Sequence, residues 1–137
     1  MYYVEDCVEV RARISRELAL IDGIELVGCA ECAAEAIACI RQICPDIVVL
    51  DLQLREGAGL DILRELGHDA RPPLMIVLTN QCDATSRERS LKAGARHYFD
   101  KSTEFQEFLA CLKQLVSETS TRDGTRTDTP GAKILQD

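Results

Sequence analysis

The chain has 137 residues, of which 46% are hydrophobic and 28% are charged, and its formal net charge is −7. We expect one compact domain, because this length excludes a sensor joined to an output domain. The acidic excess argues against a nucleic-acid-binding surface, which needs clustered positive charge. No apolar run is long enough to span a membrane and no signal peptide begins the chain, so we expect a cytoplasmic protein without membrane partners.

The seven cysteines cannot all pair within the chain, because their number is odd. One suggestive spacing is Cys29-Ala-Glu-Cys32. A zinc or redox site at this spacing needs a second cysteine pair, a histidine pair or a thioredoxin-like context, and none accompanies it. We therefore expect reduced thiols that act as small hydrophobic side chains.

Short apolar runs alternate with stretches of helical periodicity along the chain. The runs predict strands, and the third is an unbroken apolar run that is typical of a buried central strand; they cover residues 2–4, 24–27, 46–51, 74–79 and 97–99. Each run is followed by a predicted helix, and the last helix begins at the capping-box spacing Thr103 to Gln106. The apolar period stops at Val116, so we expect a domain over residues 1–116 and a polar, disordered tail over 117–137.

The five strand–helix repeats predict an α/β fold, a doubly wound (βα)5 arrangement with five parallel strands covered by helices on both faces. Crossovers between parallel strands are right-handed. In such sheets a ligand site lies beyond the carboxyl ends of the strands, where the strand order reverses. The residues that follow each strand are therefore the candidates for function.

Polar residues follow four of the five predicted strands: Glu5 and Asp6 after the first, Asp51 after the third, Thr79 after the fourth and Lys101 after the fifth. Three neighbouring carboxylates repel one another, and a hard divalent cation such as Mg²⁺ relieves this repulsion. An Asp carboxylate beside such a cation is a competent nucleophile towards phosphorus. An ammonium and a hydroxyl can then neutralise and hold the phosphoryl oxygens. The residue types match the formation of an aspartyl phosphate.

An ordered set of motifs resembles the receiver domain of two-component response regulators, over residues 1–116. The matching pieces are Val4-Glu5-Asp6, Val48-Val49-Leu50-Asp51, Gly59, Val77-Leu78-Thr79, Ala93-Gly94-Ala95 and Tyr98-Phe99-Asp100-Lys101. The resemblance implies the flavodoxin-like receiver fold with strand order 2-1-3-4-5. It also implies a single-domain, stand-alone receiver that acts in phosphorelay signalling as a phosphoacceptor module. Such a module is not an enzyme, because it catalyses only its own phosphoryl transfer.

The resemblance assigns a role to each residue of the predicted site. Asp51 is the phosphoacceptor, and Lys101 and Thr79 assist the phosphoryl transfer. The implied cofactor is Mg²⁺ or Mn²⁺, bound by Asp6, by Asp51, by Glu5 largely through water, and by the backbone carbonyl of Gln53.

The resemblance also implies a switch and a set of partners. Thr79 and Tyr98 form the switch pair, in which Thr79 moves towards the phosphoryl group and Tyr98 turns inward, although an aromatic residue in such a strand often only packs. The donor is a histidine kinase or a histidine phosphotransfer protein. A downstream protein binds the face of the fourth helix, fifth strand and fifth helix, through which receivers also form homodimers.

Three residues depart from the usual receiver pattern. Arg55 stands where the family usually has proline, and Ser102 replaces the proline that usually follows the lysine. Asn80 stands where the family has alanine or glycine, so we expect Asn80, together with Gln53, to modulate access to the phosphoryl group. A cis peptide bond before a residue other than proline costs about 3–4 kcal/mol, so Ser102 leaves the geometry of the Lys101 peptide open.

Two other functions remain as alternatives. A haloacid-dehalogenase-like phosphatase also uses an Asp nucleophile after a buried strand, but it needs a second Asp at the position of Gln53. A flavodoxin-like electron carrier has the same architecture, but it needs a Ser/Thr/Gly-rich phosphate loop after the first strand. Glu5-Asp6-Cys7 occupies that position and would repel a cofactor phosphate.

Overall fold

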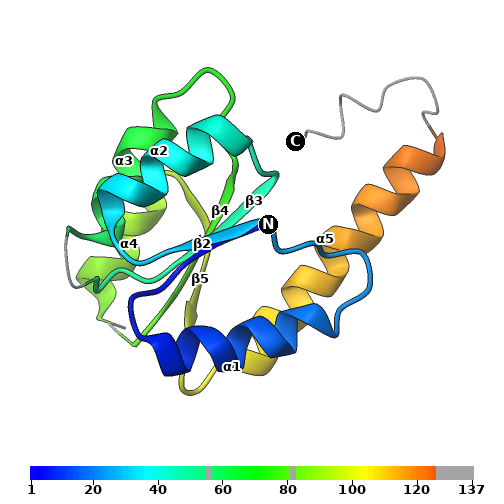
Figure 1. Ribbon diagram of the computed structural model, residues 1–137, viewed down its shortest axis with the longest axis horizontal. Helices are drawn as coiled ribbons and strands as arrows, with labels where there is room; N and C mark the ends of the chain where they lie inside the picture. The colour runs from blue at the N-terminus through cyan, green and yellow to red at the C-terminus, as the bar shows by residue number, and fades with distance from the viewer. Residues whose placement is uncertain (55–56, 81–82, 126–137) are drawn as a thin grey trace.

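The computed structural model describes residues 1–54, 57–80 and 83–125. Strands and helices alternate from the first residues to the last described ones (Figure 1). The strands are β1 (Tyr2–Val4), β2 (Gly28–Ala30), β3 (Ile47–Leu50), β4 (Leu74–Thr79) and β5 (Ala95–Asp100). The helices are α1 (Val8–Ala19), α2 (Ala33–Ile43), α3 (Gly59–Gly67), α4 (Ala84–Ala93) and α5 (Phe105–Thr125).

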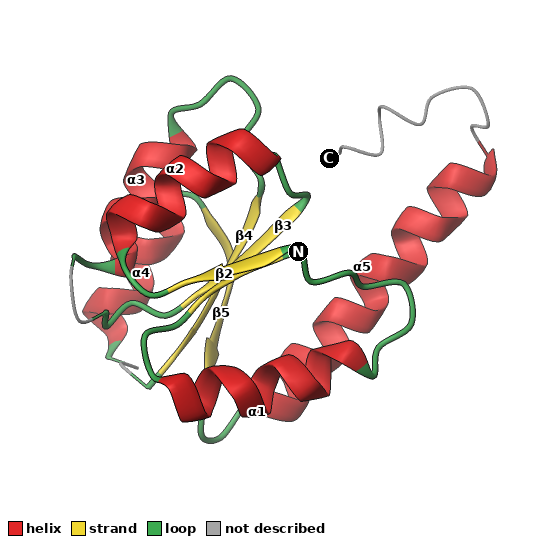
Figure 2. Cartoon of the chain, in the orientation of Figure 1, coloured by secondary structure: helices red, strands yellow, loops and turns green. Residues whose placement is uncertain are grey.

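All strand pairs are parallel, and the order in the sheet is β2-β1-β3-β4-β5. The predicted fold class and strand order are therefore confirmed. Helices α1 and α5 cover one face of the sheet, while α2, α3 and α4 cover the other (Figure 2). The strand order reverses between β1 and β3, so the carboxyl end of β3 lies at the switch point where a ligand site is expected.

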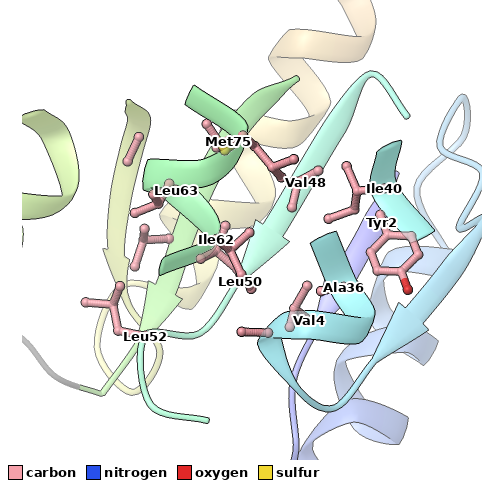
Figure 3. Packing of buried hydrophobic residues seen from close by; sticks show 14 of the residues in the cluster. Tyr2, Val4, Ala36, Ile40, Val48, Leu50, Leu52, Ile62, Leu63 and Met75 are labelled. Atoms are coloured by element: carbon pink, nitrogen blue, oxygen red, sulfur yellow. The ribbon is translucent and has the colours of Figure 1, made fainter. Parts of the chain in front are cut away.

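The continuous apolar run of β3 is explained by burial on both faces. Val48 and Leu50 belong to the core cluster under α2 and α3, which also contains Ile62 and Leu63 (Figure 3). Val49, between them, packs in the second cluster, which faces α1 and α5. Because successive side chains of a strand point to opposite faces, a strand between two helical layers must be apolar at every position.

The second strand begins four residues later, and ends three residues later, than the apolar pattern predicts. The structure places β2 at Gly28–Ala30, where Gly28 is paired with Tyr2, instead of at residues 24–27. Ile24 and Leu26 are half-buried and pack against the cluster that contains Tyr3. A β-carbon at Gly28 would lie 2.7 Å from the Tyr2 ring, so the aromatic side chain needs a glycine opposite it. The pairing partner thus decides the position of this edge strand.

Helix α5 is longer than predicted. It continues to Thr125, nine residues beyond Val116, whereas the sequence pattern predicts a disordered tail from residue 117. A helix can extend past its apolar stripe because each added residue gains a backbone hydrogen bond once the helix is nucleated. The rest of the predicted tail, residues 126–137, lies outside the described residues, as do Arg55 and Glu56 of the loop after β3.

The start of α5 also differs from the prediction. Asp100, and not Thr103, caps this turn, because Asp100 Oδ1 accepts hydrogen bonds from the amides of Ser102 (2.7 Å) and Thr103 (3.2 Å). Glu104 Oε1 accepts a bond from the Asp100 amide at 2.8 Å in return. The pairing is reciprocal like that of a capping box, but it joins residues four positions apart and closes the turn that precedes α5. Among the described helices, none is long and apolar enough to cross a membrane.

Candidate functional site

The predicted polar residues meet at the carboxyl edge of the sheet. The Lys101 ammonium lies between two carboxylates, 2.7 Å from Asp51 Oδ2 and 2.7 Å from Glu5 Oε1. All three residues are almost completely buried. Glu5 follows β1, Asp51 follows β3 and Lys101 follows β5, so the parallel sheet brings together residues that are up to 96 positions apart in the chain.

Every oxygen of the Asp51 carboxylate has a donor. Oδ1 accepts from the Thr79 hydroxyl at 2.7 Å and from the Gln53 amide at 3.0 Å, while Oδ2 accepts from Lys101. A buried carboxylate is tolerated only when it is paired and hydrogen-bonded, as here. Thr79 is fully buried, so its hydroxyl has a fixed position relative to Asp51.

The Glu5 carboxylate is also held by Tyr3, which the sequence pattern does not mark as a site residue. Tyr3, in β1, donates its hydroxyl to Glu5 Oε1 at 3.4 Å, and the Cys7 amide donates to Oε2 at 3.2 Å. Burial raises the pKa of the Tyr3 phenol above its ordinary value, and the negative charges of Glu5 and Asp51 raise it further. Tyr3 therefore stays protonated and keeps its donor.

The two ion pairs keep Lys101 charged. Burial acts to lower the pKa of the ammonium, but the hydrogen bonds and charges of Asp51 and Glu5 outweigh it, so the pKa lies above its ordinary value. A permanent positive charge thus stands within hydrogen-bond distance of Asp51. Such a charge can neutralise the negative oxygens of a phosphoryl group attached there.

Gly59 allows α3 to begin directly beside Asp51. A β-carbon at this position would collide with the backbone carbonyl oxygen of Asp51 and would lie 2.8 Å from Leu52 Cα. The Gly59 amide donates to the Leu52 carbonyl at 3.0 Å. Gly59 is part of the sequence resemblance but has no role assigned there. Its role is steric, since only glycine permits the backbone of α3 to come this close to Asp51.

The predicted metal ligands are only partly brought together. Glu5 and Asp51 share Lys101, whereas Asp6 is half-buried and no hydrogen bond or ion pair joins it to a described side chain. Within the described residues, no three His, Cys, Asp or Glu side chains form a group of the kind that holds a metal ion. The chemistry of the site nevertheless fits Mg²⁺. The two buried carboxylates of Glu5 and Asp51 share one ammonium, which leaves an excess of negative charge, and oxygen is the ligand atom that Mg²⁺ prefers.

The Thr79 and Tyr98 side chains both point inward. Tyr98 is only 5% exposed and belongs to the core cluster beneath α3. The Arg87 guanidinium lies over its ring, with the Cζ atom 5.6 Å from the ring centroid. This contact between α4 and β5 adds a cation–π attraction that favours the inward position of the ring.

The two unusual residues beyond β4 and β5 contact each other. The Ser102 hydroxyl donates to Asn80 Oδ1 at 2.9 Å. The Lys101–Ser102 peptide bond is trans, because the described residues include no cis bond. Lys101 still reaches Asp51, so the site forms without the proline that usually follows the lysine.

The profile of the response regulator receiver domain matches residues 1–113. The chain belongs to this family. As a receiver domain, it is similar to the response regulator GacA of Pseudomonas aeruginosa, with 30% identity over 115 residues that make up 83% of this chain and 53% of GacA. It is also 30% identical to the response regulator UvrY of Escherichia coli over 114 residues, 83% of this chain and 52% of UvrY.

The receiver domain therefore spans about half the length of the curated relatives that it matches. Its fold is similar to that of a LuxR-family response regulator from Aurantimonas, with a TM-score of 0.78 and 26% identity over 85% of this chain and 84% of that one. The BeF3-activated receiver domain of Klebsiella pneumoniae RstA gives a TM-score of 0.75 and 28% identity over 84% and 96% of the two chains. Receiver domains are signalling modules of two-component systems, which agrees with the predicted class.

Proposed function

We propose that this receiver domain accepts a phosphoryl group on Asp51. The observation that carries the proposal is the environment of the Asp51 carboxylate, which Lys101 Nζ and the Thr79 hydroxyl each contact at 2.7 Å. One donor ends β4 and the other directly follows β5, and they surround the carboxylate with the groups that phosphoryl transfer needs for charge neutralisation.

The reaction is a direct displacement at phosphorus. An Asp51 oxygen attacks, a P–O bond forms, the P–N bond to the donor histidine breaks, and its electron pair returns to the imidazole nitrogen. Lys101 and Thr79 hold the phosphoryl oxygens as the group arrives. We propose a histidine kinase or a histidine phosphotransfer protein as the donor.

We propose that Asp6, Asp51 and the Gln53 carbonyl hold Mg²⁺ or Mn²⁺, with Glu5 contributing through water. The divalent cation neutralises phosphoryl oxygens when it is bound. Glu5 accepts hydrogen bonds from Lys101 on one oxygen and from the Cys7 amide on the other, so it also holds Lys101 in place.

We propose that phosphorylation of Asp51 is sensed by another protein through a protein–protein contact. Thr79 contacts Asp51, and Tyr98 lies on the adjacent strand beside α4, so these residues join the reacting carboxylate to the surface of α4, β5 and α5. A downstream protein, or a second copy of the chain, would bind that surface. A phosphatase of the haloacid-dehalogenase type is not favoured, since the side chain of Gln53 is an amide where that chemistry needs a carboxylic acid.

The test is intact-mass measurement after incubation with acetyl phosphate and Mg²⁺. The chain should gain the mass of one phosphoryl group, and it should gain none when EDTA removes the metal. The Asp51→Asn variant should gain nothing, because an amide oxygen is a poor nucleophile. An equal gain in Asp51→Asn would refute the assignment, and steady release of phosphate from a phosphate ester would favour the phosphatase instead.

A further inference from the structure

Two exposed residues just beyond the site form a bridge between the ends of β4 and β5. We propose that the hydrogen bond from Ser102 to Asn80 positions Lys101 and Thr79 for phosphoryl transfer, so that both bridge residues are positioning residues of the reaction. The Ser102 hydroxyl lies 2.9 Å from Asn80 Oδ1. This inference rests on the proposed acceptance of a phosphoryl group by Asp51.

The position of the bridge in the chain is the first argument. Asn80 directly follows Thr79, and Ser102 directly follows Lys101, so each bridge residue is covalently next to a residue that contacts Asp51. The register of β4 and β5 ends at Thr79 and Asp100. The Lys101 amide then donates to the Thr79 carbonyl at 2.8 Å. The hydrogen bond between Ser102 and Asn80 therefore adds one side-chain contact just beyond the last backbone hydrogen bond between these two strand ends.

The surrounding loop supplies the second argument, because it presents the Ser102 hydroxyl towards β4. Asp100 Oδ1 accepts from the amides of Ser102 and Thr103, at 2.7 and 3.2 Å, which closes a tight turn at the end of β5. With that turn closed, the hydroxyl reaches across to a residue 22 positions away.

The residue types supply the third argument. The bridge needs a donor at 102 and an acceptor at 80, and neither an alanine at 80 nor a proline at 102 could form it. The two departures of this chain from the usual receiver pattern are therefore complementary. Together they replace, by a side-chain hydrogen bond, the conformational restriction that a proline would place on the loop next to Lys101.

The test is a double-mutant cycle on the rate of phosphorylation by acetyl phosphate. In Ser102→Ala the rate at saturating acetyl phosphate should fall about three- to tenfold, as expected for one lost hydrogen bond, while the half-saturating concentration stays the same. The effect of Ser102→Ala should disappear in an Asn80→Ala background, and Ser102→Thr should restore the rate because it restores the hydroxyl.

Thr103→Ala is the matched control. Thr103 lies in the same turn and carries a hydroxyl, but it contacts Asp100 through its backbone amide. The control should react at the rate of the unaltered protein. Unchanged rates in Ser102→Ala, or an equal effect of Ser102→Ala with and without Asn80, would overturn the inference while leaving phosphorylation of Asp51 intact.

A second measurement does not depend on phosphorylation. Amide hydrogen exchange of Lys101, followed by NMR, should become about three- to tenfold faster in Ser102→Ala than in Thr103→Ala. The reason is that Ser102→Ala loses the side-chain hydrogen bond next to the backbone bond from Lys101 to Thr79. Faster exchange in a protein that takes up no phosphoryl group would refute the proposed function and keep the bridge. Equal exchange in both variants would refute the bridge.

Discussion

Lys101 is the residue on which the charge balance of the site depends. Its ammonium pairs with Glu5 and Asp51 at 2.7 Å, and all three side chains are removed from water. A buried charge without a partner is far more costly than a buried pair. Removing the Lys101 cation should therefore lower the free energy of unfolding more than removing one of the two carboxylates.

Lys101→Met should lower the free energy of unfolding by about 3–5 kcal/mol, because it leaves two buried carboxylates without their cation. Asp51→Asn should cost less, since Lys101 keeps Glu5 as its partner. Urea unfolding at neutral pH measures both values. A Lys101→Met variant as stable as Asp51→Asn would contradict the arrangement of charges described above.

The phenol of Tyr3 gives a prediction about pH. The folded-state pKa of Tyr3 is raised above its ordinary value of 10.0, chiefly by burial. Below about pH 10 the stability that the raised pKa contributes is fully present. It is lost as the pH rises from about 10 towards the folded-state pKa. Stability should therefore fall less steeply in Tyr3→Phe than in the unaltered protein between about pH 9 and pH 11.

Urea unfolding at several pH values tests this prediction. Lys101 also has a raised pKa, but it is present in both proteins, so its contribution cancels in the comparison. At neutral pH the Tyr3→Phe variant should be about 1 kcal/mol less stable because Glu5 loses one donor. Parallel pH profiles for the two proteins would mean that the Tyr3 hydroxyl does not titrate with unfolding.

The sequence predicts the charged and hydroxyl members of the site but not their supporting residues. Glu5, Asp51, Thr79 and Lys101 are recognisable because each polar residue directly ends or follows a predicted apolar strand. Tyr3 is hidden within such a strand, where an aromatic residue is expected to pack, and its role depends on the path of its hydroxyl to Glu5. The structure brings several of these side chains into contact, and the roles of all the site residues, Asp6 and Tyr98 included, remain predictions.

At the scale of single elements, the start of α3 depends on the close approach of the Gly59 backbone to the backbone of Asp51 and Leu52. Gly59→Ala should destabilise the domain by about 1–3 kcal/mol or more, because the added methyl collides with the Asp51 carbonyl and must push α3 away. Gly67→Ala, at the other end of the helix, brings a β-carbon 2.8 Å from the Ala93 carbonyl, and its cost should be smaller.

Phosphorylation separates the two glycine variants more clearly than stability does. Gly59→Ala displaces the backbone that carries Asp51, so its phosphorylation rate should fall, whereas Gly67→Ala should react normally. Thermal unfolding and the acetyl phosphate assay measure the two effects. Normal phosphorylation of Gly59→Ala would show that α3 can move without disturbing Asp51.

Element boundaries are less predictable than element types, for a physical reason. The apolar run at residues 24–27 has the composition of a strand, yet the pairing of Tyr2 with Gly28 places β2 after it. Periodicity reports which residues are buried, and Ile24 and Leu26 are indeed partly buried. It does not report which residues exchange hydrogen bonds with a neighbouring strand, because that depends on the partner.

At the scale of the whole molecule, the described fold depends on the chain up to about residue 116. Val116 lies against Gly23, and Leu112 is fully buried under the sheet. The free energy of unfolding of a chain ending at residue 116 should therefore lie within about 0.5 kcal/mol of that of the full chain. Urea unfolding of the two chains tests the proposed domain boundary, and a larger loss would place part of the stability after residue 116.

A chain ending at residue 111 is the matched control for that truncation. It lacks Leu112 and Leu115, which pack in the cluster on the α1 and α5 face, and it should lose about 2–5 kcal/mol or more. A stable shorter chain would contradict the described packing of α5 and would require another source of burial for this face.

The most direct test of the account is to locate the phosphoryl group in the phosphorylated chain. Borohydride reduces an acyl phosphate of aspartate to homoserine, and peptide mass spectrometry then identifies the altered residue. Homoserine is expected at position 51 alone, since Lys101 and Thr79 surround that carboxylate. Reduction at Glu5 or Asp6, or a phosphorylated chain with an intact Asp51, would contradict it.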